Sequence, residues 1–166
     1  MIEVLVSITL VAFALFALIG MQTTALRHQQ MAHLRSIANQ FSADLAERVR
    51  ANIQGAHRGA YNVSPQRYPA LASRAPACAT SGECAPHELA AKDLHEWRVG
   101  LSRAMPGGWG DIAGSVADGF TIRVYFRDAT ITSGDDSNLT DENCKTSVVN
   151  VDPHKDVRCL SMVFFP

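Results

Sequence analysis

The first 26 residues of this chain almost lack charge, since Glu3 is the only acidic or basic side chain among them. Proline is absent before Pro65, and Gly20 is the only glycine before Gly55. Both residue types disfavour helix interiors, so their absence predicts one helix over residues 2–54. Gly55 is the expected stop of that helix.

Hydrogen-bonding side chains are also scarce near the N-terminus. The apolar run from Val4 to Met21 is 18 residues long, and only Ser7 and Thr9 interrupt it. This length suits a membrane-spanning helix. A secretory signal peptide is the alternative, but a basic flank and a small-residue cleavage site are missing. We therefore expect residues 1–25 to form a membrane helix.

Motifs of enzymatic chemistry are missing as well. The sequence has no Gly-x-Ser-x-Gly elbow, no phosphate-binding loop and no dinucleotide fingerprint. The formal net charge of −1 gives no sign of nucleic-acid binding. We expect a protein that is not an enzyme and that needs no cofactor.

An acidic region near the C-terminus offers the one weak candidate for a metal site. Residues 128–156 hold seven carboxylates against two lysines. Oxygen ligands suited to calcium come from Asp135, Asp136, Asn138 and Asp141. Because the spacing is not that of an EF-hand, we favour a solvated loop and predict no metal.

Four cysteines, Cys78, Cys84, Cys144 and Cys159, all follow the apolar segment. An even number in an exported domain favours two disulfides, although four cysteines allow three pairings. Zinc would need ligand pairs at spacings of two to four residues, which these cysteines do not provide. We expect the sequential pairing, Cys78–Cys84 and Cys144–Cys159.

Residues 26–54 are apolar on one side only, which predicts an amphipathic second half of the long helix. The apolar positions recur at spacings of three and four: Leu34, Ala38, Phe41, Leu45, Val49 and Ile53. A second helix is expected from about Pro86 to Met105. Its predicted buried face is Ala90, Leu94, Trp97, Leu101 and Met105.

After Gly110 the apolar period changes to two, which is typical of strands. We expect a strand over 112–116, a two-residue hairpin turn at 118–119 and a half-buried strand over 120–126. Further strands are expected over 159–165 and, more weakly, over 148–151. The predicted fold class is α+β: a long N-terminal helix packed on a small antiparallel sheet, with a second short helix and a head formed by residues 55–166.

The N-terminal residues Ile2-Glu3-Val4-Leu5-Val6, followed by an unbroken apolar helix, resemble the N-terminus of type IV pilins. Segments scattered along the chain are similar to PilV-type minor pilins: residues 39–40, 47–52, 78–86, 91–97 and 105–108. The sequence lacks the Gly-Phe-Thr and the basic leader that precede Ile-Glu in that family. We therefore expect Met1 to be an internal methionine, with the leader and its cleavage site upstream.

The resemblance implies a structural subunit, a minor pilin that assists initiation and assembly of a type IV pilus in twitching motility and attachment. Glu3 matches the family's glutamate, which pairs with the N-terminal amine of a neighbouring pilin. The implied partners are other minor pilins, the major pilin and a prepilin peptidase, with methylation of the mature N-terminus. The head would be periplasmic while the helix sits in the inner membrane, and extracellular once it is in the pilus.

Two other functions remain open. The same architecture would serve a minor pseudopilin of type II secretion, although residues 47–52 and the cysteine pattern weigh against it. A membrane-tethered periplasmic binding domain that does not polymerise is the third. In that case Glu3 would merely reach the membrane interface.

Overall fold

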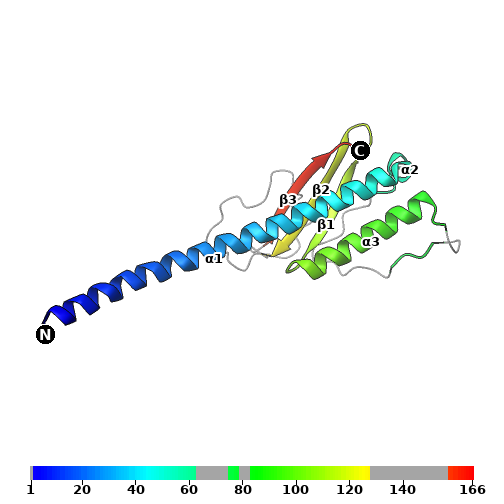
Figure 1. Cartoon of the computed structure of the whole chain (residues 1–166). Coiled ribbons are helices and arrows are strands. Elements are labelled where there is room, and N and C mark those ends of the chain that lie inside the picture. The colour runs from blue at the N-terminus through cyan, green and yellow to red at the C-terminus, as the bar shows by residue number, and fades with distance from the viewer. Residues whose placement is uncertain (1, 63–74, 79–82, 128–156) are drawn as a thin grey trace. The chain divides into compact units, whose positions relative to one another are not determined.

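The computed structural model describes residues 2–62, 75–78, 83–127 and 157–166. These residues form three helices and three strands, in the order α1, α2, α3, β1, β2, β3 (Figure 1). The chain divides into two compact units, Met1–Leu34 and Arg35–Pro166, and α1 (Ile2–Ala51) contributes to both.

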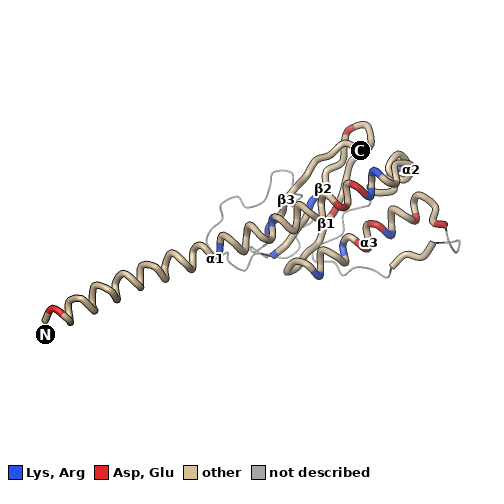
Figure 2. Tube along the Cα trace, in the orientation of Figure 1, with Lys and Arg blue, Asp and Glu red and all other residues tan. Residues whose placement is uncertain are grey.

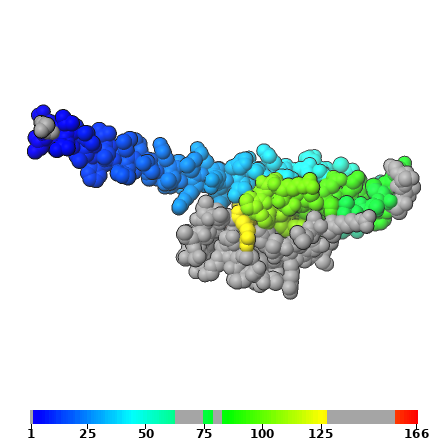
Figure 3. Space-filling model, turned by 90° about the horizontal axis from the view of Figure 1, so that it is seen from below, coloured from blue at the N-terminus to red at the C-terminus, as the bar shows by residue number. Residues whose placement is uncertain are grey.

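The first unit consists of helix α1 up to Leu34. Every side chain of residues 2–30 is exposed, and Figure 3 shows their uncovered surface on the face turned to the viewer. Gly20 lies in open space, since a Cβ at this position would meet no heavy atom within 4 Å. The apolar part of α1 therefore exposes its side chains along its whole length.

The end of α1 differs from the prediction of one helix over residues 2–54. α1 stops at Ala51, and a short α2 (Ile53–His57) follows a break at Asn52. Asn52 has φ −110° and ψ 53°, and its side-chain oxygen accepts a hydrogen bond from Gly55 N at 3.2 Å. Asparagine side chains compete with the helical backbone in this way, which explains the break.

Gly55 is not the helix stop that its sequence position suggested. It lies inside α2 and is buried. A Cβ here would stand 2.6 Å from Asn52 Nδ2 and 2.8 Å from the carbonyl oxygen of Pro86. Glycine is needed at this position because α2 and the start of α3 approach closely.

The apolar stripe of α1 is buried within the second unit. Ala38, Leu45 and Val49 are fully buried, and Phe41 is half-buried. Ile53, the last predicted member, is 37% exposed. The break at Asn52 takes it out of the helical phase of the stripe.

The second helix, α3 (Pro86–Ala104), matches the prediction and has proline in its first turn. The Ala85 backbone N–H donates to Glu88 Oε2 at 2.8 Å, which caps the helix. The five predicted core residues are all buried: Ala90, Leu94, Trp97, Leu101 and Met105. A positive φ of 61° at Gly107 then turns the chain toward the sheet.

The sheet is antiparallel with strand order β1-β2-β3. Its strands are β1 (Trp109–Ser115), β2 (Gly119–Arg127) and β3 (Val157–Phe164). Ile112 pairs with Ile122, and Val124 with Leu160. Figure 1 shows α3 beside the C-terminal part of α1, next to the strands. The predicted α+β fold is confirmed.

The predicted two-residue hairpin turn is wrong. Ser115 pairs with Gly119, so three residues, 116–118, form the loop. The Ser115 hydroxyl accepts from the Asp118 N–H at 3.0 Å and lies 2.8 Å from Asp118 Oδ2, which closes the longer loop. Gly119 follows with φ 85°, the left-handed conformation that three-residue hairpin loops favour.

β2 is also more buried than the predicted half-buried strand. Its second face carries Arg123 and Tyr125, and both are buried. Arg123 lies opposite Asp111 on β1, with 3.5 Å between Nη1 and Oδ2, so the buried guanidinium has a counter-charge. The weaker strand expected over 148–151 lies outside the described residues.

Candidate functional site

The first candidate site is the apolar part of α1, with one carboxylate near its start. Large apolar side chains are exposed along it, among them Phe13 at 74% and Phe16 at 73%. Glu3 is the only acidic residue before Asp44, and Figure 2 shows a red acidic position near the N-terminal end of α1. Among the described residues, Glu3 has no cationic partner.

The hydroxyl groups of this segment are satisfied within the helix itself. Ser7 donates to the Glu3 carbonyl at 2.8 Å, and Thr9 to the Val6 carbonyl at 2.8 Å. Thr23 and Thr24 both donate to the carbonyl of Gly20. Such bonds let hydroxyls sit in an apolar medium at little cost, so Glu3 is the charge that still needs a partner there.

By length and composition, α1 is one helix capable of crossing a membrane. Glu3 lies at the start of the helix. A carboxylate at full membrane depth costs roughly 2.5–3.5 kcal/mol. Within an apolar assembly the same charge would seek a cation from another chain.

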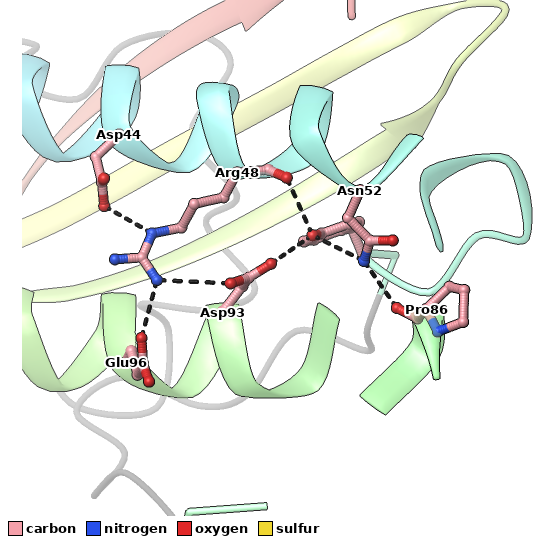
Figure 4. A network of polar contacts seen from close by, with 7 residues as sticks. Asp44, Arg48, Asn52, Pro86, Asp93 and Glu96 are labelled. Carbon is pink, nitrogen blue, oxygen red and sulfur yellow. Dashed lines mark hydrogen bonds and ion pairs between the residues drawn. The ribbon is translucent and has the colours of Figure 1, made fainter. Parts of the chain in front are cut away.

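The second candidate site is a polar cluster between α1 and α3, formed by Arg48, Asn52, Tyr61 and Asp93 (Figure 4). Tyr61 donates its hydroxyl to Asp93 Oδ2 at 2.6 Å. Asn52 Nδ2 donates to the Tyr61 hydroxyl at 3.2 Å and to the Pro86 carbonyl at 2.7 Å. The cluster therefore connects the end of α1, the segment after α2 and the start of α3.

Arg48 is the charged member of this polar cluster from α1. Its Nη1 lies 3.5 Å from Asp93 Oδ1 and 3.0 Å from Glu96 Oε2, while Nε lies 3.0 Å from Asp44 Oδ2. Burial lowers the pKa of Arg48, but the bonds to Glu96 and Asp44 outweigh that effect and raise it. Glu96 and Asp44 are half exposed, so solvent screens their ion pairs with Arg48, whereas Asp93 is mostly buried.

Tyr61 is the buried centre of the cluster, with no exposed surface. Burial raises the pKa of the Tyr61 phenol far above its usual range, and the hydrogen bond to Asp93 raises it further. The phenol therefore stays a neutral donor. Its partner Asp93 is only 8% exposed.

Residues 20–95 of the chain match the profile of the family described as "Tt1218-like: Type IV pilin Tt1218". The match supports the type IV pilin superfamily. It covers the end of the apolar segment and all four members of the polar cluster. No curated protein and no solved structure matches significantly. Fold, apolar helix and family match together support a pilin-like structural subunit.

The residues that resemble PilV-type pilins also form contacts that sequence reasoning missed. Residues 47–52 supply Arg48 and Asn52, and residues 91–97 supply Asp93. The sequence held one sign of these contacts, since the polar Asp93 comes directly before the core residue Leu94. Only the fold shows that Arg48 and Asp93, which are 45 residues apart in the sequence, lie in contact.

Aromatic contacts complete the interface between α1 and the rest of the head. Trp97 Nε1 donates to the carbonyl of Phe41 at 2.8 Å. A Cβ at Gly100 would stand 2.7 Å from the Phe41 ring, so glycine admits that ring against α3. On the other side, Arg50 lies over the Phe164 ring, 5.5 Å from its centroid, and donates to the Phe165 carbonyl at 3.3 Å.

The cysteine residues lie in the second unit. A disulfide joins Cys78 and Cys84, with 5.0 Å between their Cα atoms. Cys159, in β3, is disulfide-bonded too. Because Cys144 lies outside the described residues, its pairing with Cys159 stays a prediction.

Metal-binding groups are not found in the described ranges, where no cluster of three His, Cys, Asp or Glu side chains could hold an ion. The weak calcium candidate, Asp135, Asp136, Asn138 and Asp141, lies outside those ranges and is not tested.

Proposed function

We propose that this protein is a PilV-type minor pilin that assists initiation and assembly of a type IV pilus. The observation that carries the proposal is the exposed apolar stretch of α1, with its single carboxylate, in a chain whose head has the pilin-like α+β fold. An apolar helix surface of this size needs a lipid or protein environment.

Glu3 would fix the register between neighbouring helices, which the apolar side chains cannot do. Apolar surfaces slide past one another at little cost, so they fix no register between neighbouring helices. A carboxylate in a medium of low dielectric constant is disfavoured by several kcal/mol unless a cation meets it. The N-terminal amine of a neighbouring pilin, exposed after cleavage by a prepilin peptidase, is the cation in our proposal.

The subunit occupies two environments in turn. Before assembly, α1 lies in the inner membrane and the head in the periplasm. After assembly, α1 lies in the filament core beside other minor pilins and the major pilin. Mature N-termini of such subunits would carry methylation, and the assembled pilus would serve twitching and attachment.

The test is Glu3→Ala in the full-length protein. We expect membrane insertion and head disulfides to be unchanged, while the amount in sheared pili falls by at least about tenfold, equivalent to about 1.4 kcal/mol. Glu3→Gln separates the charge from the size of the side chain and should reproduce most of the loss.

Glu47→Ala is the matched control, because Glu47 is an exposed carboxylate on the same helix. It should assemble like the unmodified protein. Wild-type amounts of Glu3→Ala in sheared pili, with normal twitching, would contradict the role of Glu3. That result would favour a tethered periplasmic domain, whereas secretion genes beside the coding sequence would favour a pseudopilin.

A further inference from the structure

The apolar part of α1 is followed directly by a stretch rich in hydrogen-bond donors. We call it the donor collar, and its side chains are all exposed: Arg27, His28, Gln29, Gln30 and His33. No Asp or Glu occurs in the sequence between Glu3 and Asp44. In Figure 2 the helix is uncharged from the acidic position near its start to the first basic one.

The side chains of the donor collar make no polar contact with the described residues. None of its five side chains has a hydrogen-bond or ion-pair partner among residues 2–62, 75–78, 83–127 and 157–166. A guanidinium carries five N–H donors in a planar fork, and an amide or an imidazole adds donors beside it. Acid-free donor groups of this kind suit an anionic oxygen ligand, phosphate above all.

The position of the donor collar along α1 indicates which phosphates it would meet. Arg27 follows Glu3 by 24 residues, which corresponds to about 36 Å along a helix. The hydrocarbon core of a bilayer is about 30 Å thick, and its headgroup layers extend a few ångströms beyond. If Glu3 lies at one interface, Arg27 lies at the phosphates of the opposite leaflet.

We infer that the donor collar binds the phosphates of anionic phospholipids and thereby fixes the depth of α1 in the membrane before assembly. The inference rests on the membrane insertion of α1 in the proposed function. It uses Glu3 only as the residue that marks the opposite interface, and it requires neither an ion pair of Glu3 nor pilus assembly. Arg27 is the principal contact, and the side chains of His28, Gln29, Gln30 and His33 are auxiliary.

The experiment uses the full chain in vesicles of phosphatidylcholine with 30% phosphatidylglycerol. Insertion is measured first, as the fraction that resists carbonate extraction. Lipids that remain bound after mild detergent extraction are then counted by native mass spectrometry. We expect a preference for phosphatidylglycerol that Arg27→Gln reduces about fivefold, and that high salt reduces similarly.

Arg58→Gln is the matched control, because Arg58 is exposed in the second unit and the same charge is removed. It should keep the preference. An inserted protein without any preference, or an equal loss in both variants, would overturn the donor collar and leave the proposed function standing. Failure to insert would overturn both. If a second copy of the chain is retained in place of phosphatidylglycerol, and Arg27→Gln abolishes that retention, the inference is also overturned.

Discussion

Residues 2–26 and residues 38–51 belong to the same helix, yet their side chains meet opposite surroundings. In the first stretch every side chain is exposed and the hydroxyls bond back to their own helix. In the second, one face is buried and polar side chains connect it to α3. The second part of the helix therefore packs on the head, whereas the first part exposes its apolar side chains.

The comparison also shows how each part obtains its register. Buried hydrogen bonds such as that of Tyr61 to Asp93 accept few alternative alignments, so the α1–α3 alignment is fixed within the chain. The first part offers Glu3 alone for that purpose. In the proposed assembly, the register of this part would come from a neighbouring molecule.

Removing a large buried aromatic side chain should have the largest effect. Trp97→Ala deletes a side chain that is 1% exposed and donates to the Phe41 carbonyl. We expect it to lower the free energy of unfolding of the head by about 3–5 kcal/mol in denaturant titrations. Phe13→Ala, in the exposed part of α1, should change it by less than about 0.5 kcal/mol. Equal effects would contradict the division of the helix.

Breaking the polar cluster should rank second. Asp93→Ala removes the acceptor 2.6 Å from the Tyr61 hydroxyl, leaving only the Arg48 carbonyl at 3.4 Å, and it removes a counter-charge of Arg48. We therefore expect a loss of about 2–3 kcal/mol. Tyr61→Phe should cost about 1 kcal/mol. If the two groups act together, the double variant should lose less than the sum. Strict additivity in the same titrations would refute the coupling.

Alkaline pH should weaken the second unit through Tyr61. Because its pKa is raised in the folded state, the neutral phenol stabilises the head fully below the unfolded pKa of about 10. That contribution is lost as pH rises from there toward the folded pKa, by up to about 1.4 kcal/mol per unit. Stability measured at several pH values should fall more steeply above pH 10 in the unmodified protein than in Tyr61→Phe. Parallel curves would count against the cluster.

The smallest effect is expected for a hydroxyl in the apolar part. Ser7→Ala removes only a bond to the carbonyl of its own helix. The free energy of the helix should change by less than about 0.5 kcal/mol, so carbonate-resistant insertion and helix content should stay close to those of the unmodified protein. A large loss of assembly in this variant would mean that Ser7 also contacts a neighbouring molecule.

Sequence periodicity predicted the elements well where one apolar stripe decides them. The α3 core from Ala90 to Met105 is an example, because its spacing admits a single buried face. The end of α1 could not be predicted in this way. The Asn52 side chain breaks the helix by accepting from Gly55 N, and it is held in place by Tyr61 and Pro86, which come near it only once the chain is folded.

Other misses share this cause. The burial of Arg123 depends on Asp111 lying opposite it in the sheet, which no local pattern reveals. The role proposed for Glu3 is the reverse case. It is inferred from the resemblance and from the isolation of Glu3 in the sequence, and its partner would come from another molecule.

The contacts that hold α1 to the head also set an order of events during synthesis. Arg48 and Glu96 are 48 residues apart, Phe41 and Trp97 are 56 apart, and Arg50 and Phe165 are 115 apart. At about 5–20 residues per second, the ribosome needs roughly 6–23 s to make those 115 residues after Arg50. During that interval Arg50 has been made, but the Phe164 ring and the Phe165 carbonyl that it contacts do not yet exist. The contact between the end of α1 and the C-terminal strand can therefore form only after β3 has been made.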